Sequence, residues 1–221
     1  MKTIVIDIET YKTTNPAHMA YLVSNVKASG TLKDPDKIAA DIAAKQTEVV
    51  GKTSFDGAFG SIICIGLHEL DKADHECKFA SFYNYGGREK EMLEDFMLYL
   101  DGLIDGQASP QIVGHNVTWD WRFIIHRCIV HGVKISNAFP RNDRSGHLSD
   151  TMTLWAGYRD TISLDKLCLA LDIETPKGEM DGSKVGAAYE AGEHAKIVEY
   201  NRLDCIATAA VYKKMQLCNL I

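Results

Sequence analysis

The chain has 221 residues, of which 46% are hydrophobic and 24% charged, with 24 Lys and Arg against 30 Asp and Glu. This composition is typical of a globular protein and excludes a disordered or collagen-like chain. The formal charge of -6 argues against a protein that holds nucleic acid by a broad positive field.

The N-terminal sequence and the cysteines indicate the compartment. No apolar run approaches the roughly 20 residues of a transmembrane helix, and Asp7 comes too early for a signal peptide. Disulfide scaffolds are small and cysteine-dense, so we expect reduced core thiols in a cytoplasmic protein without a membrane segment. The six cysteines stand singly, at Cys64, Cys77, Cys128, Cys168, Cys205 and Cys218.

The first element is a predicted strand over residues 2–8, which is β-branched and almost wholly apolar up to Asp7. Such a run is typical of a strand buried on both faces of a sheet. Residues 11–57 break this pattern with Asn15-Pro16 and Asp34-Pro35, and with helical spacing in 35–50. An unstructured loop of this length is unusual, so we expect an insertion of one or two helices with loops.

The remaining chain alternates strands and helices. We expect strands at 60–70, 77–85, 111–114 and 147–153, and helices at 88–104, 118–131, 163–171 and 193–217. Asp150 could support a catalytic side chain from behind or cap a turn, and we expect the cap. This order predicts one α/β domain over residues 1–221, with a central mixed five-stranded sheet, helices on both faces and an insertion after the first strand.

Two acids stand close together at Asp7 and Glu9. Alternate residues of a strand project from the same face, so the two carboxylates lie side by side and repel each other. A bound cation would relieve that cost. The alternative is a strand end that turns into solvent.

Two further polar groups follow later in the chain. Asp120 falls in the first turn of a predicted helix, four residues after Asn116, where an acid could instead complement the helix dipole. Tyr200 and Asp204 are four residues apart and therefore share one face of the last helix. A hydrogen bond between them, or pairing with Arg202, is the alternative there.

In this order the three groups resemble the motifs of the DEDD (DnaQ-like) superfamily of 3'-5' exonucleases, which includes polymerase proofreading domains. Asp7 and Glu9 match its first motif, Asn116 and Asp120 its second, and Tyr200 and Asp204 its third. The histidine branch of the superfamily would carry histidine where this chain has Glu199, so the likeness is to the tyrosine branch. The chain is similar to stand-alone exonucleases of phages and prophages that are related to the polymerase B proofreading domain.

The resemblance implies a ribonuclease-H-like fold. It also implies metal-dependent release of nucleoside 5'-monophosphates from the 3' end of nucleic acid, with single-stranded DNA as the expected substrate. It further implies two divalent cations, Mg²⁺ or Mn²⁺, which suit carboxylate ligands. By similarity, Asp7 bridges both ions, Glu9 and Asp204 hold the ion that binds the attacking water, and Asp120 serves the other. Tyr200 then orients the water.

Three residues are expected to contact the substrate. The resemblance places Thr10 and Asn116 at the terminal nucleotide, and Trp119 could stack on a base or pack against the sheet. Two divalent ions would offset part of the negative charge, so we expect a small footprint on a few 3'-terminal nucleotides.

Two other functions stay open. One is the same chemistry on RNA or short oligonucleotides, and the other is a non-catalytic, replication-associated nucleic-acid-binding module. We expect a monomer with a possible replication or recombination partner.

Overall fold

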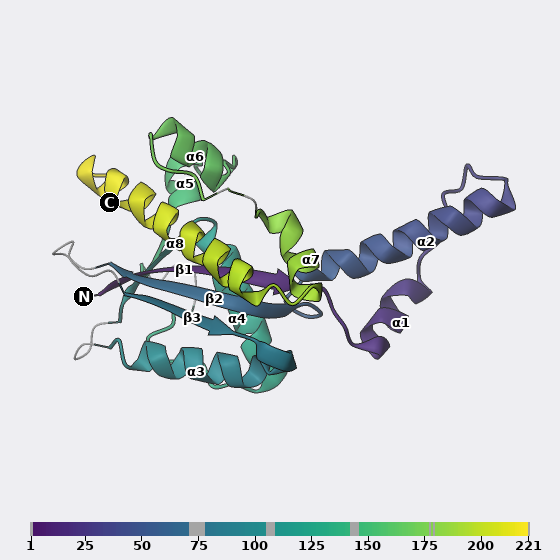
Figure 1. The fold of residues 1–221 in the computed structure, drawn as a ribbon, viewed down its shortest axis with the longest axis horizontal. Coiled ribbons are helices and arrows are strands. Elements are labelled where there is room, and N and C mark those ends of the chain that lie inside the picture. The colour runs from purple at the N-terminus through teal and green to yellow at the C-terminus, as the bar shows by residue number, and fades with distance from the viewer. Residues whose placement is uncertain are drawn as a thin grey trace.

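The computed structural model describes residues 2–70, 78–104, 109–141, 146–176, 178 and 180–220 (Figure 1). The strands are β1 (Thr3–Tyr11), β2 (Ser61–Leu70), β3 (Phe79–Tyr83), β4 (Gln111–Gly114) and β5 (Leu148–Asp150). The α-helices are α1 (Pro16–Ser24), α2 (Pro35–Gly51), α3 (Glu89–Asp101), α4 (Val117–His131), α5 (Thr151–Ala156), α6 (Leu164–Ala170), α7 (Val185–Glu190) and α8 (His194–Leu217). Short 3-10 helices are η1 (Lys52–Phe55), η2 (Tyr85–Gly87) and η3 (Gly182–Lys184).

The five strands form one mixed sheet in the order β3-β2-β1-β4-β5. β1 and β2 are antiparallel, as are β2 and β3, whereas β4 and β5 run parallel to β1. The predicted mixed five-stranded sheet is therefore confirmed, and its topology is consistent with a ribonuclease-H-like fold.

Helices cover both faces of this sheet, with α3 on one side and α8 on the other (Figure 1). The alternation of side chains along β1 explains the layers. Ile4, Ile6 and Ile8 join the core shared with α3 and α4, whereas Val5 packs with Cys205 of α8. α5 and α6 pack in turn against α8. Asp7 has the parity of Val5, so the strand turns its acids toward α8.

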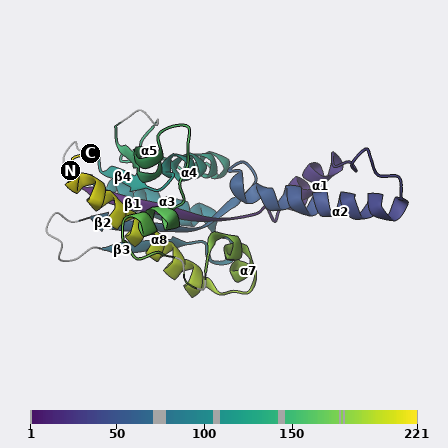
Figure 2. The same ribbon diagram turned by 90° about the horizontal axis from the view of Figure 1, so that it is seen from above.

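The insertion forms an arm of α1 and α2 that projects away from the sheet (Figures 1 and 2). Both helices begin with a proline, Pro16 in α1 and Pro35 in α2. The side chains of the preceding residues, Asn15 and Asp34, cap the helices by accepting hydrogen bonds from backbone N–H groups of the first turn. Neither helix contains a buried residue. The predicted helical insertion is confirmed, although β1 continues to Tyr11 before the arm begins.

Two predicted strand boundaries are wrong. The strand predicted at 147–153 covers only Leu148–Asp150, because Asp150 accepts hydrogen bonds from the backbone N–H groups of Met152 and Thr153 and starts α5. The expectation that Asp150 caps a turn is confirmed by this contact. The strand predicted at 77–85 ends at Tyr83, because the 3-10 helix η2 follows at Tyr85; residue 77 lies outside the described residues.

The cysteines are free thiols where the structure describes them. Cys64, Cys128, Cys168 and Cys205 are buried, as expected of core thiols, and Cys218 is exposed at the end of α8. Cys77 lies outside the described residues. Among the described helices, none combines the length and the apolar character that a membrane span requires.

Candidate active site

The candidate site lies where β1 extends beyond the end of its neighbour β4. β4 pairs with β1 only along Thr3–Val5 and ends at Gly114, whereas β1 runs on to Tyr11. The next helix, α4, starts at Val117 and packs closely against the end of β4, since a Cβ on Gly114 would lie only 2.7 Å from the Cβ of Val117. The first turn of α4 therefore lies close to the open edge of β1.

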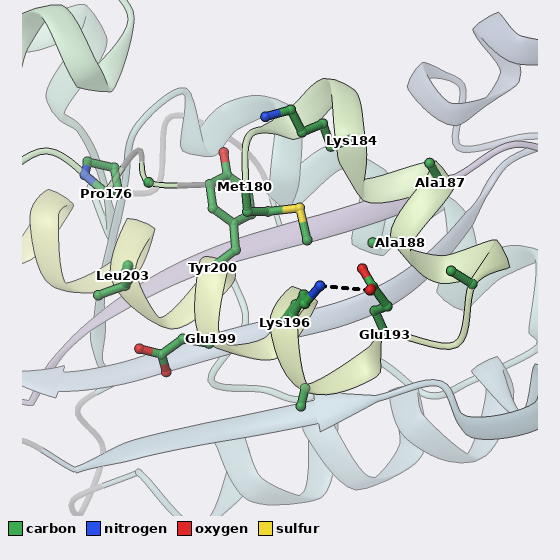
Figure 3. A pocket seen from close by; sticks show the side chains of 13 residues that line it. Pro176, Met180, Lys184, Ala187, Ala188, Glu193, Lys196, Glu199, Tyr200 and Leu203 are labelled. Atoms are coloured by element: carbon green, nitrogen blue, oxygen red, sulfur yellow. Dashed lines mark hydrogen bonds and ion pairs between the residues drawn. The ribbon is translucent and has the colours of Figure 1, made fainter.

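Two cavities share Tyr200 and Pro176 in their linings. The larger, of about 740 Å³, is formed by α7, α8 and the segment before them, and its Lys196 pairs with Glu193 (Figure 3). The smaller, of about 190 Å³, is called the cleft here. Its described lining is Asp7, His115, Ser163, Leu164, Asp165, Pro176, Tyr200 and Asp204. Of the four acids predicted to carry the chemistry, Asp7 and Asp204 line the smaller cavity, whereas Glu9 and Asp120 are outside its described lining.

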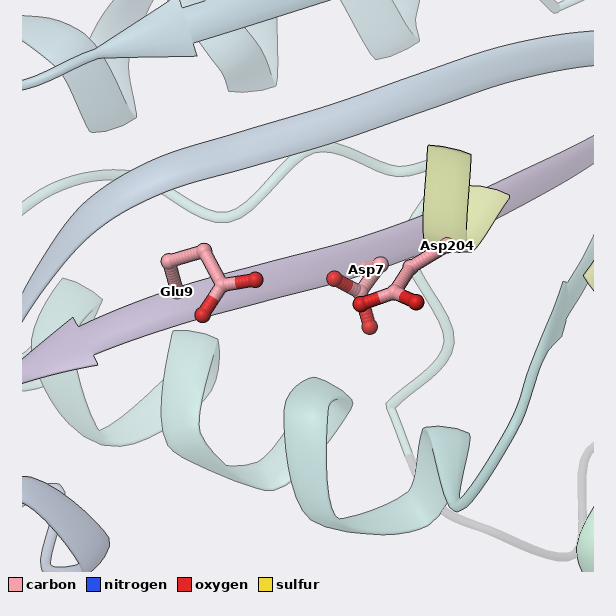
Figure 4. Close-up of side chains that lie close together, drawn as sticks. All are labelled: Asp7, Glu9 and Asp204. Carbon is pink, nitrogen blue, oxygen red and sulfur yellow. The ribbon is translucent and has the colours of Figure 1, made fainter. Parts of the chain in front are cut away.

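Three carboxylates converge beside the cleft. Asp7 and Glu9 project from β1 and Asp204 from α8, and one ligand oxygen from each lies within 4.8 Å of the others (Figure 4). Helix α8 thus places Asp204 beside Asp7 and Glu9 of β1. This distance suits a shared cation and is unfavourable for three bare negative charges.

Asp120 supplies a fourth carboxylate from the first turn of α4. Its side chain is buried, and its Oδ2 has no hydrogen-bond partner among the described residues. The charge of Asp120 contributes to raising the pKa of Asp7. A buried carboxylate oxygen without a donor is costly unless a cation supplies the missing interaction.

Burial and mutual repulsion also raise the pKa values of these carboxylates. Burial first, and then the charges of Glu9, Asp204 and Asp120, raise the pKa of Asp7 well above its usual range. Burial followed by Asp204 and Asp120 does the same to the pKa of Glu9, and burial followed by Asp150 and Asp204 raises that of Asp120. Hard oxygen ligands of this kind fit Mg²⁺ or Mn²⁺.

Tyr200 lies one helical turn before Asp204 and lines the cleft. Burial, followed by the charges of Asp204 and Glu9, raises the pKa of its phenol above the ordinary value. Its hydroxyl therefore keeps its proton at neutral pH and can donate a hydrogen bond.

The three residues expected to contact substrate have contacts within the protein. The Thr10 hydroxyl donates to the Ser54 carbonyl at 2.7 Å, and the Trp119 ring packs against Phe123 at 5.2 Å. The Asn116 side chain is exposed, and its left-handed backbone (φ 66°) is held by Asp150, whose Oδ1 accepts from its N–H. The described lining of the cleft includes none of these three, so their roles stay predictions.

Two polar residues of the site were missed by reasoning from the sequence. Asn201 is fully buried, and its Nδ2 donates to Asp7 Oδ2 at 2.7 Å. His115 lines the cleft, with ring nitrogens 3.0 Å from Thr151 Oγ1 and 2.8 Å from the Ile162 carbonyl oxygen. The signal for Asn201 was its position three residues before Asp204, which places both on one helical face.

Comparison with known proteins places this geometry in a family. Residues 55–220 match the model of predicted 3'-5' exonucleases related to the exonuclease domain of PolB. The chain belongs to this family. The matched range includes Asp120, Tyr200 and Asp204 and begins after β1, so the exonuclease family covers three of the five expected catalytic positions directly.

One relative of the chain is the uncharacterized protein MJ0365 of Methanocaldococcus jannaschii, which is 27% identical over 126 residues. That alignment covers 53% of this chain and 71% of the relative. Membership of the exonuclease family implies a nucleic-acid substrate, and exonuclease domains of this kind use divalent metals.

Proposed function

We propose that this chain is a metal-dependent 3'-5' exonuclease that releases nucleoside 5'-monophosphates from single-stranded DNA. The observation that carries the proposal is the convergence of Asp7, Glu9 and Asp204 within 4.8 Å. The buried, unpartnered Oδ2 of Asp120 and the protonated hydroxyl of Tyr200 support it.

Asp7, Glu9, Asp120 and Asp204 would hold two divalent cations. When bound, such ions activate water and stabilise the leaving oxygen of a phosphodiester. The Tyr200 hydroxyl orients the attacking water by hydrogen bonding, because a phenol that keeps its proton is a poor base. The water oxygen bonds to phosphorus and releases a proton to solvent, the bond to the 3' oxygen of the preceding nucleotide breaks, and that oxygen takes up a proton.

The surface of the site supports a small footprint. A cleft of about 190 Å³ is smaller than most ligand pockets and suits a chain end better than a long duplex. On the arm, Lys45 pairs with Asp41 and Lys52 pairs with Glu48, which weakens any continuous track for phosphates. Of the three predicted contacts, Asn116 is the exposed one, whereas Thr10 follows Glu9 and Trp119 precedes Asp120 in the sequence.

Oligonucleotides labelled at either end test the proposal. DNA and RNA strands are incubated with Mg²⁺, Mn²⁺ or EDTA, and we expect a ladder shortening from the 3' end of DNA only when metal is present. Asp204→Asn should remove this activity, and the exposed-acid control Asp95→Asn should retain it. A ladder on RNA alone would reassign the substrate. No metal-dependent shortening of any strand would leave a binding module.

We further propose that residues 1–221 act as one cytoplasmic domain and as a monomer, with the α1–α2 arm available to a replication or recombination partner. Light scattering after size exclusion tests the oligomeric state. A mass near 24.5 kDa is expected, and a stable dimer would contradict the proposal.

A further inference from the structure

Asn201 connects the last helix to the first strand at the centre of the site. Its side-chain Nδ2 donates to Asp7 Oδ2 at 2.7 Å, and its Oδ1 accepts from the Cys64 thiol, with 3.6 Å between oxygen and sulfur. Both ends of the amide are thus engaged. A fully buried amide held at both ends has one orientation.

The sheet leaves room for this amide at one position. Gly66 is the cross-strand partner of Asp7, and a Cβ at that position would lie 2.0 Å from Asn201 Oδ1. The absence of a side chain at Gly66 therefore allows the helix to approach β1 and β2 closely. The same close packing of α8 on β1 and β2 places Asp204, three residues further along α8, in the carboxylate cluster.

We propose that Asn201 is a positioning residue for the metal-binding carboxylates. By donating to Asp7 Oδ2 it fixes the rotation of the carboxylate and would leave Oδ1 available to a cation, and by anchoring α8 over Gly66 it sets the separation of Asp7 and Asp204. The inference rests on the proposed metal-dependent function. Hydrogen bonds that orient a metal ligand typically affect metal affinity or activity by about 10–100-fold.

A matched pair of buried asparagines separates positioning from stability. Asn84 is also buried, and its Nδ2 donates to the Ile62 carbonyl at 3.1 Å. Asn201→Ala should weaken Mn²⁺ binding, measured by calorimetry without substrate, by about 10–100-fold. Asn84→Ala should lower the melting temperature and leave the Mn²⁺ affinity within about twofold. Wild-type Mn²⁺ affinity in Asn201→Ala would overturn the inference.

Activity gives a second readout on the same variants. Asn201→Ala should lower kcat on a DNA oligonucleotide and raise the Mn²⁺ concentration needed for half-maximal rate, with little change in KM. The shape-matched Asn201→Leu, which fills the space without a donor, should behave in the same way. Equal losses in the Asn84 and Asn201 variants would show a merely structural role.

Nuclear magnetic resonance on the unaltered protein covers the case in which the Asn201 variants fail to fold. On titration with Mg²⁺, the side-chain amide resonance of Asn201 should shift together with the backbone signals of Asp7 and Asp204, while that of Asn84 stays fixed. Shifts at the two acids without one at Asn201 would overturn this inference alone. No shift at the acids would overturn the metal site, and both proposals with it.

Discussion

Arg127 and Glu89 form a bidentate ion pair in the buried space between α4 and α3. Arg127 Nε lies 2.9 Å from one oxygen of Glu89, and Nη2 lies 2.8 Å from the other. The same carboxylate accepts from the backbone N–H of Ile62 in β2 at 2.7 Å. One charge pair thus fixes two helices to the sheet, and one of those helices carries Asp120.

Removing one member of this pair should strongly destabilise the protein. Arg127→Met leaves the Glu89 carboxylate buried without its main partner, for which a loss of about 3–5 kcal/mol is typical. Urea unfolding measures the change in the free energy of unfolding. The control is Glu94→Gln, which breaks the exposed Lys90–Glu94 pair at 3.9 Å and should cost less than about 0.5 kcal/mol. A loss below about 1 kcal/mol in Arg127→Met would contradict a stabilising role.

Asp7→Asn should stabilise the metal-free protein, and more so as pH rises. Because the folded-state pKa of Asp7 is raised, the folded form holds a proton that the unfolded chain has already released, so stability falls with increasing pH in that interval. The variant lacks this loss. Its advantage should be near zero below the ordinary carboxyl range of about pH 4 and should grow above it.

Thermal unfolding with EDTA between pH 4 and pH 8 checks this. A gain of 1–2 kcal/mol corresponds to roughly 2–8 °C for a chain of this size. Added Mn²⁺ should reverse the order of the two proteins, because the ion stabilises the wild type by binding to its folded state. A pH-independent difference would show that Asp7 carries no raised pKa.

Tyr200→Phe should lower kcat by about 100-fold with little effect on KM, because a misplaced reactant typically costs that much. The phenol pKa is raised, so no ionisation of Tyr200 should appear in the wild-type rate profile between pH 7 and pH 9. Tyr158→Phe, at a fully accessible tyrosine (98% exposed), is the control and should leave kcat unchanged. A limb of the profile that rises with pH and vanishes in Tyr200→Phe would instead identify the phenolate as a base.

Gly66→Ala should damage both stability and catalysis. The added Cβ would lie 2.0 Å from Asn201 Oδ1 and 3.0 Å from Cys205 Sγ, so the Asn201 side chain or α8 itself must shift. Overpacking of this kind typically costs about 1–3 kcal/mol. Chemical unfolding and kcat are measured beside Gly30→Ala, a site with no atom within 4 Å, which should change neither by much. Wild-type kcat in Gly66→Ala would show that the helix tolerates displacement.

The sequence predicted those parts of the site that depend on local periodicity. The period of two along β1 pairs Asp7 with Glu9, and the helical period pairs Tyr200 with Asp204. The helical spacing in residues 35–50 likewise indicated the second helix of the arm, α2. These relationships need only neighbours along the chain.

Relationships between distant segments could not be predicted in this way. The bond from Asn201 to Asp7 joins residues 194 positions apart, and it depends on the absence of a side chain at Gly66 on a third element. For Asp150 the cap was favoured, but its contact with the backbone N–H of Asn116, which follows the neighbouring strand β4, was not predicted. Such contacts follow from packing, which a single sequence does not display.

The arm begins where the pairing of β1 with β2 ends. Tyr11 and Ser61 are cross-strand partners, so β1 and β2 form a hairpin whose turn has been replaced by the α1–α2 arm. Lengthening such a turn costs little beyond the slowly growing entropy of loop closure. The arm is therefore an exchangeable module: its length and surface can diverge, or be redesigned, while the register that aligns Asp7 with Gly66 stays the same.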